Sequence, residues 1–385
     1  MMKHLNILNY ALSSLYRRKF KTFALLAAYT FTIAVIASVL FLTHALKTET
    51  NALLESAPDL VVQKMLGGRH DLIPIQHAES INAFLGVKHT TPRYWGYYYD
   101  ALIKANYTLI GAGSGSLHLD LLEGRLPTEP DECAVGKGVS MIRGAQLGKD
   151  LILINNKNMG VLYKVTGVFS SASSMFTNDL VVLTDRAIVD FFDLSQNKAT
   201  DLAVTIPNKR EIQTIAAKIK KKFPDTRPIT KNELIKTYDL VFNWRSGMML
   251  TLFSGAIFAF CLLAWDKATG ISADEKQEIG ILKAIGWSTS DVLLLKFWEG
   301  IAISLVSFFA GVIIAYIHVF SFGAPALTPI MKGWSTLFPL FQLQPNINLL
   351  HLYTLGFFTV IPYLASTVFP IWKTAITDPE SVMRG

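Results

Sequence analysis

Four long apolar runs are the main feature of the chain, and polar stretches separate them. The runs cover residues 22–43, 246–266, 292–317 and 351–372. Each is close to the ~20 residues that an α-helix needs to cross the ~30 Å hydrocarbon core of a bilayer. The first run is too long for the apolar part of a signal peptide, and no small-residue cleavage site follows it. The pattern therefore predicts four transmembrane helices, the first of which is a retained anchor.

The stretch between the first two runs, residues 44–245, is long enough for one sizeable domain. It begins as a helical continuation of the first run, which Pro58 ends. Short apolar segments with period-two alternation follow between Gly and Asn turns, and this pattern predicts strands. The segments interpreted in this way include DLVVQ, RYWGYYYDALI, NYTLIGAG, SLHLDLLEG, ECAVGKGVSMIRGA, LILIN, VLYKVTGVF, DLVVLT and DLAVTIP. Helices are predicted over residues 75–85 and 209–223, so the domain is of the α+β class.

Basic residues beside the apolar runs predict the orientation in the membrane. A cluster of them precedes the first run and places the N-terminus in the cytoplasm: Arg17, Arg18, Lys19 and Lys21. Four crossings then divide the remaining polar segments between the two sides. The cytoplasmic segments are an N-terminal amphipathic segment (1–21), a hairpin (267–291) and a tail (373–385), whereas the α+β domain and the loop 318–350 lie outside. We therefore predict a multi-pass protein of the bacterial cytoplasmic (inner) membrane with both termini in the cytoplasm.

The composition supports a membrane protein and excludes some functions. Hydrophobic residues make up 51% of the chain and charged residues 17%, whereas soluble proteins carry about 25% charged residues. The net charge of +7 comes largely from residues that flank the apolar runs and from a lysine-rich helix near Lys218. Nucleic-acid binding is therefore a poor interpretation. The two cysteines, Cys133 and Cys261, lie in different contexts and predict neither a disulfide framework nor a metal knuckle.

No motif predicts a nucleotide or catalytic site. The stretch GAGSGS at 111–116 has the glycines of a phosphate-binding loop, but it lacks the Gly-Lys-Ser/Thr ending. We therefore expect a non-catalytic chain that binds no cofactor of its own. His70, Asp71 and His77 are weak candidates for a metal site, because imidazole and carboxylate suit several transition metals. Their spacing is not that of a tight metal motif and favours histidines in surface loops.

The most informative polar segment is Asp274–Asp291, which lies between the second and third apolar runs. On a helix, Ile279, Leu282 and Ile285 or Gly286 share one face, and charged residues occupy the others. Gly286 is placed to end this helix, and Ser288 to begin the next one with Asp291 as its capping partner. The spacing leaves two interpretations open: an amphipathic connector that lies on the membrane, or a helix that binds a partner at the membrane surface.

A resemblance to a known family favours the second interpretation. Residues 278–303, EIGILKAIGWSTSDVLLLKFWEGIAI, resemble the signature segment of FtsX-like, MacB-like ABC transporter permeases, the type VII or mechanotransmission family. LLEGRLPTEPDECAVGKGVSMIRGAQLGKDLIL is similar to part of the family's outer domain, and the segment Ala375–Arg384 to its closing tail. The resemblance implies an α-helical membrane protein with four transmembrane helices and a large extracytoplasmic α+β domain of the MacB type between the first two. The chain departs from the family at residues 274–277, DEKQ, where an Arg-rich approach is usual.

The resemblance also implies a partner for the hairpin. In the family this hairpin contacts a separate ATP-binding subunit, which holds the ATP and Mg. The residues that it marks for this contact are Glu275, Lys276, Glu278, Ile279, Gly280, Leu282, Lys283 and Gly286. It also implies a glutamate early in the third span, and Glu299 fits this position.

The expected function is that of a permease subunit that couples ATP hydrolysis on a partner chain to motion of the outer domain, for export or extraction of a cargo. Two alternatives stay open: a permease of a metal (iron or copper) handling system, and a signalling subunit that activates an extracytoplasmic enzyme. The expected partners are the ATP-binding subunit, a second permease copy or paralogue, membrane lipid, and an outer cargo or accessory protein. Small residues that would support a dimer are Ala24, Ala28, Gly247, Gly255 and Ala259.

Overall fold

The computed structural model describes residues 2–55, 57–114, 119–170, 177–269, 273–327 and 343–376. The chain divides into two compact units. The first, here called the helical unit, comprises Met1–Ala45, Asn243–Leu327 and Pro345–Gly385. The second, the α+β unit, comprises Leu46–Phe242 and Thr328–Gln344.

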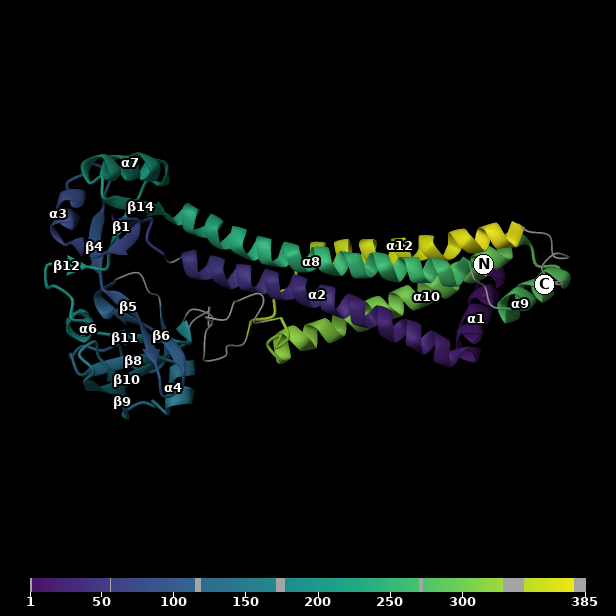
Figure 1. Cartoon of the computed structure of the whole chain (residues 1–385), viewed down its shortest axis with the longest axis horizontal. Helices are drawn as coiled ribbons and strands as arrows, with labels where there is room; N and C mark the ends of the chain where they lie inside the picture. Colours follow the sequence, from purple (N-terminus) through teal and green to yellow (C-terminus); the bar gives the residue numbers. More distant parts are fainter. Residues whose placement is uncertain are drawn as a thin grey trace. The chain divides into compact units, whose positions relative to one another are not determined.

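Long helices make up the helical unit (Figure 1). They are α1 (Met2–Arg17), α2 (Lys19–Glu55), α8 (Lys231–Thr269), α9 (Ala273–Ala284), α10 (Thr289–Tyr316) and α12 (Leu349–Ile376), with a π-turn at Ile317–Ser321 after α10. Helices α2 and α8 also contribute residues to the α+β unit. The predicted continuation of the first run is confirmed, since α2 ends at Glu55, shortly before Pro58.

Three helical segments among the described residues are long and apolar enough to cross a membrane: Lys19–Asn51, Thr289–Ser321 and Leu349–Val368. They contain the first, third and most of the fourth predicted runs. The second run lies within α8, in which the side chains of 263–269 lie outside the described residues. The structure therefore supports three of the four predicted membrane-spanning helices. The helix predicted for the second run stays a prediction.

Close backbone approaches hold α10 between α2 and α12. A Cβ atom on Gly311 would lie 2.8 Å from the side chain of Ile33 in α2, and a Cβ atom on Gly300 would lie 2.9 Å from Leu364 in α12. Glycine at these positions lets the helices pack closely, as small residues do in membrane bundles. Helix α2 also contacts α12, since Tyr29 stacks on Tyr363 with ring centroids 5.1 Å apart and donates a hydrogen bond to a carbonyl oxygen of α12.

The α+β unit contains two sheets of four or more strands, in which most neighbouring strands are antiparallel. The first has the order β14-β1-β13-β4, with β2 beside β1. Its strands are β1 (Leu60–Leu66), β2 (Arg69–Asp71), β4 (His89–Arg93), β13 (Asp201–Thr205) and β14 (Thr226–Thr230). Helices α3 (Gln76–Asn82) and α7 (Ile212–Lys222) pack on it through Ile81, Ile215 and Ile219. Strands β3 (Ile73–Pro74) and β12 (Lys198–Ala199) form a separate two-stranded antiparallel sheet.

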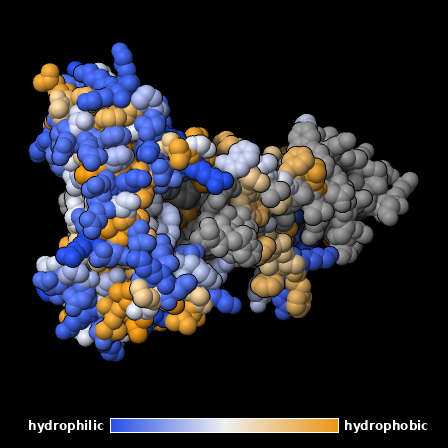
Figure 2. Space-filling view, turned by 60° about the vertical axis from the view of Figure 1, so that its left-hand side comes forward, coloured by the Kyte–Doolittle hydropathy of each residue, from blue (hydrophilic) through white to orange (hydrophobic). Residues whose placement is uncertain are grey.

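The second sheet has the order β5-β6-β11-β8-β10-β7, with β9 beside β10. Its strands are β5 (Trp95–Asp100), β6 (Ala105–Gly111), β7 (Asp120–Gly124), β8 (Glu132–Gly136), β9 (Asp150–Ile154), β10 (Gly160–Ser170) and β11 (Leu180–Leu183). Helices α4 (Lys137–Arg143) and α6 (Asp185–Phe192) contribute Val139, Ile188 and Phe191 to its buried core. Hydrophobic residues gather on the outer face of β9 and β10, where Ile152 and Leu162 are cross-strand partners and both exposed. Figure 2 shows hydrophobic areas among the hydrophilic surface in this part of the unit.

The buried carboxylate of Asp201 connects the two sheets where the chain passes from β4 to β5, because it pairs with Arg93 in the first sheet and accepts a hydrogen bond from Trp95 in the second. The Arg93 guanidinium donates to both carboxylate oxygens of Asp201, at 2.6 and 2.8 Å. Trp95 Nε1 donates to the same carboxylate at 3.0 Å. Asp201 is almost fully buried, so these hydrogen bonds compensate the cost of burying its charge.

The predicted strands are largely confirmed, but two helices of the α+β unit were not predicted. The segment ECAVGKGVSMIRGA was interpreted as strands and turns, and this is wrong for Lys137–Arg143, which form α4. The glycine at 144 adopts φ +62° and ends this helix, whereas from the sequence it was interpreted as a turn between strands. Helix α6 begins at an N-cap, Thr184, directly after β11. In both cases the helix has only about two turns and directly follows a strand, so its sequence is too short to show the apolar periodicity that predicts a helix.

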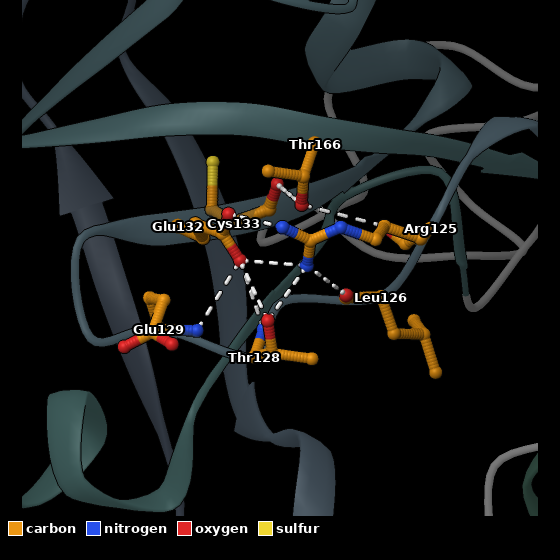
Figure 3. A network of polar contacts seen from close by, with 7 residues as sticks. All are labelled: Arg125, Leu126, Thr128, Glu129, Glu132, Cys133 and Thr166. Atoms are coloured by element: carbon orange, nitrogen blue, oxygen red, sulfur yellow. Dashed lines mark hydrogen bonds and ion pairs between the residues drawn. The ribbon is translucent and has the colours of Figure 1, made fainter.

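The turn between β7 and β8 is organised by one ion pair (Figure 3). Arg125 donates from both terminal nitrogens to Glu132, at 2.8 and 2.5 Å. Glu132 Oε2 also accepts the backbone N–H groups of Thr128 and Glu129. The hydrogen bonds from Arg125 and these amides lower the pKa of Glu132 to about 2.

Replacement of Glu132 by glutamine should loosen this turn. The expected result is faster hydrogen exchange in residues 125–133, because the amides of Thr128 and Glu129 lose a charged acceptor. The pKa of Glu132 lies below the ordinary value of 4.5. The stabilisation is therefore fully present above pH 4.5 and is lost as the pH falls through about 2. Hydrogen exchange of the full-length chain near neutral pH tests this, with Glu129→Gln as the matched control. Equal exchange in both variants would contradict it.

Candidate functional site

The hairpin between α8 and α10 has the local structure that its sequence predicts. Gly286 adopts φ +98°, a conformation that glycine accepts without the strain of a Cβ atom. Its N–H donates to the carbonyl of Lys283 at 3.0 Å, and the N–H of Trp287 donates to that of Leu282 at 3.0 Å. These two hydrogen bonds form a Schellman motif, which ends α9 at Ala284. The predicted C-cap is confirmed.

The start of α10 is also confirmed. Ser288 is its N-cap, and a reciprocal capping box joins the Ser288 and Asp291 side chains to each other's backbone N–H groups. Four residues, Ile285–Ser288, lie between α9 and α10, and the end motif of α9 is directly followed by this box. The turn between α9 and α10 is therefore fixed by local hydrogen bonds.

The apolar face of α9 is buried against other helices of the same unit. Ile279 contacts Val292 of α10, and Leu282 lies with Ile7 and Ala11 of α1. Both side chains are less than 10% exposed. Gly280 is buried as well. Three residues that the family resemblance marks for the ATPase contact thus pack inside this chain.

Glu278 ties α9 to α1. Its Oε1 accepts hydrogen bonds from Arg17 at 2.7 Å and from Tyr10 at 3.0 Å, and its Oε2 pairs with Arg18 at 2.5 Å. The aromatic ring of Tyr10 also contacts Trp287, with centroids 5.5 Å apart. From the sequence, Arg17 and Arg18 served only to predict orientation. In the structure they hold the hairpin helix.

These contacts change the titration of Glu278. Burial would raise the pKa of its carboxyl, but the hydrogen bond from Tyr10 and the charges of Arg18 and Arg17 outweigh burial and lower it below 4.5. A lowered pKa means that the carboxylate stabilises the folded state above pH 4.5. The contribution is lost as the pH falls through the lowered value.

The opposite side of the hairpin is exposed. Ile281 is 55% and Ile285 69% exposed, and Ala284 and Gly286 are exposed too. Lys283 is half-buried. Glu275 and Lys276 lie in α9, and their side chains are outside the described residues. A partner that binds the hairpin would therefore meet two exposed isoleucines.

Glu299 lies in α10 beside a lysine. Lys296 Nζ donates to its Oε2 at 2.7 Å, and the two side chains are 11% and 12% exposed. Among the described residues, Glu299 Oε1 and Trp298 Nε1 have no hydrogen-bond partner. Among the described residues, the charge of this carboxylate is therefore compensated by one lysine, three positions earlier on the same helix.

The metal candidates have other contacts. His70 Nε2 lies 2.9 Å from the carbonyl oxygen of Thr200, Asp71 pairs with Lys64 at 3.2 Å, and His77 stacks on Phe223 with centroids 4.0 Å apart. In the described ranges no three His, Cys, Asp or Glu side chains are grouped for a metal ion. The structure thus does not bring these three residues together.

Gly111 and Gly113 of the GAGSGS stretch lie against a carboxylate. The N–H of Gly113 donates to Asp185 Oδ1 at 3.1 Å, and a Cβ atom on Gly111 would lie 2.1 Å from the same oxygen. An acidic side chain thus occupies the place where a phosphate-binding loop would hold an anion. Residues 115–118 are outside the described residues.

Family comparison covers most of the chain. Residues 22–222 match the MacB-like periplasmic core domain, and residues 248–379 match the FtsX-like permease C-terminal domain. The first match alone spans more than half of the 385 residues. The chain belongs to the MacB-like, FtsX-like ABC transporter permeases. The α+β unit is therefore the extracytoplasmic domain of a membrane permease.

Individual relatives are more distant. The chain is 26% identical over 194 residues to an uncharacterised ABC transporter permease of Methanocaldococcus jannaschii, a match that covers 46% of this chain and 45% of the relative. The matched part thus spans less than half the length of that relative. Among solved structures, the periplasmic region of MacB from Actinobacillus actinomycetemcomitans aligns at 17% identity and TM-score 0.34, covering 46% of this chain and 91% of that one. The extracellular domain of the noncanonic ABC-type transporter YknZ from Gram-positive bacteria aligns at 15% and 0.33, covering 44% and 99%.

Membership of this permease family indicates a transporter subunit. Within the described residues, the hairpin is the surface that both the sequence and the geometry favour as a candidate functional site.

Proposed function

We propose that the permease couples ATP hydrolysis on its partner subunit to motion of the extracytoplasmic domain. The observation that carries the proposal is the attachment of α9: Glu278 binds three residues of the α1–α2 region, and Leu282 packs between α1 and α10. A force on the exposed side of α9 would therefore move α1 and α10 with it.

A movement of α10 could be transmitted to the outer domain through α2. Helix α10 contacts α2 at Gly311, and α2 is one unbroken helix to Glu55, with β1 beginning at Leu60. On the return path, β14 ends at Thr230 and α8 begins at Lys231. Strands β1 and β14 pair directly, with Leu60 opposite Thr230. A displacement of α2 relative to α8 would thus act on two neighbouring strands of one sheet.

The proposal includes the location and the partners of the permease. It lies in the bacterial inner membrane with both termini and the hairpin in the cytoplasm, as the basic residues before α2 favour. ATP and Mg bind to the partner. A second permease copy packs on the exposed small residues of α2, Ala24 and Ala28. Ionisable side chains in the described spans are few, which favours work on a cargo outside the membrane over a hydrophilic channel.

Substitution of the exposed hairpin residues tests the ATPase contact. Ile281→Asp/Ile285→Asp should weaken binding of the partner ATPase by about tenfold or more, because central apolar residues dominate interface energies. The measurement is permease-dependent ATPase activity in reconstituted membranes, together with recovery of the complex. Ile154→Asp, an exposed isoleucine of the outer domain, is the matched control. Unchanged complex formation by the double variant would contradict the proposal.

A further inference from the structure

A groove lies at the bend between α1 and α2, on the side that faces α10. Its volume is about 390 Å³ and its walls are almost entirely apolar. The residues that form it include Leu12 and Leu15 of α1, Leu26 of α2, and Ile303 and Val306 of α10. These helices all belong to the helical unit, and Figure 1 shows α1 and α2 meeting at an angle there.

One cation lines this groove. Lys19 is the first residue of α2 and is exposed. Its neighbours Arg17 and Arg18 are paired with Glu278, whereas no carboxylate partner of Lys19 occurs among the described residues. The ammonium group lies over the ring of Phe20, 5.6 Å from its centroid. Lys19 is thus a positive charge at the groove that no carboxylate of the described residues neutralises.

The surroundings are those of a membrane surface. Three aromatic residues at the bend are more than 70% exposed: Tyr16, Phe20 and Phe23. Aromatic and basic residues together mark the level of lipid headgroups in membrane proteins. Directly beyond them, α2 enters its apolar run. The groove therefore has its charged end at headgroup level and its apolar walls at the level of acyl chains.

We propose that this groove binds an anionic phospholipid, with an acyl chain between α1, α2 and α10 and the lipid phosphate paired with Lys19. Apolar walls favour a hydrocarbon chain, and the ammonium group favours an anionic headgroup over a zwitterionic one. A bound lipid would contact α1 on a face next to the one that packs on α9, since Ile7 and Ala11 face the hairpin whereas Leu12 and Leu15 line the groove. The site does not depend on the proposed coupling function.

The experiment measures lipids that stay bound to the full-length permease. The protein is extracted from vesicles of phosphatidylglycerol and phosphatidylcholine in equal parts, and retained lipids are quantified by native mass spectrometry. Wild type should retain phosphatidylglycerol in excess. Lys19→Glu should reduce this excess by at least about fivefold, since the loss of one basic residue at an anionic surface alone has this effect and the new carboxylate adds repulsion. Val306→Trp, which fills the groove, should reduce retention of both lipids.

Two variants serve as matched controls. Lys149→Glu reverses an exposed charge in the outer domain, and Ile313→Trp adds an indole to an exposed position of α10 outside the groove. Both should retain phosphatidylglycerol as the wild type does. Equal retention of the two lipids by the wild type would overturn the proposal, and so would an unchanged excess in Lys19→Glu or an unchanged total retention in Val306→Trp.

Discussion

Lys296→Met is expected to destabilise the permease by ~3–5 kcal/mol, since it leaves a buried carboxylate without its cation. Lys296 Nζ lies 2.7 Å from Glu299 Oε2, and both side chains are almost 90% buried. Glu299 lacks a second anchor among the described residues, because its Oε1 accepts no hydrogen bond there. The methionine fills the space of the lysine stem but cannot compensate the charge.

Removal of the whole pair is the control that separates charge from packing. Lys296→Met/Glu299→Leu should recover most of the lost stability, because replacing a buried ion pair by apolar residues is often neutral or stabilising. Unfolding by denaturant in one detergent measures the free energy of each variant. A single variant as stable as the wild type, or a double variant as unstable as the single one, would show that the pair does not stabilise α10.

Local features of the hairpin and of the outer domain could be predicted from the sequence. Gly286 and the Ser288–Asp291 pair specify their own turn, since each acts within a few residues. Pro58 likewise predicted the end of α2 near Glu55. Amphipathic periodicity predicted α7. These elements depend on steric effects and hydrogen bonds between residues close together in the sequence, so the local sequence is enough to predict them.

Long-range pairing could not be predicted in the same way. Glu278 meets Arg17 and Arg18 across more than 250 positions of the chain, and no spacing in the sequence connects them. Amphipathicity predicted that Ile279 and Leu282 share a face, but not that α1 and α10 would cover it. The prediction that Ile285 or Gly286 shares this face is wrong, since Ile285 is 69% exposed and Gly286 is exposed too.

Charge reversal at Glu278 is the second large effect that we expect. Glu278→Arg would remove the contacts with Arg17, Arg18 and Tyr10 and place a third cation beside two arginines. Each of these ion pairs is worth at most ~1 kcal/mol, because solvent screens partly exposed charges. The larger consequence is for coupling: α9 would keep only its apolar contacts with α1, so permease-dependent ATPase stimulation should be lost although the rest of the bundle stays folded.

A charge swap distinguishes an internal contact from a contact with the ATPase. Arg18→Glu combined with Glu278→Arg restores one ion pair between α1–α2 and α9, and it should recover part of the stimulation. Hydrogen exchange in residues 2–17, raised in Glu278→Arg, should fall again in the swapped variant. If Glu278 instead binds the ATPase directly, the swap leaves stimulation absent while exchange recovers. Recovery of both signals would show that residue 278 acts through its ion pair with the α1–α2 region. The partner surface would then be the exposed side of the hairpin, at Ile281 and Ile285.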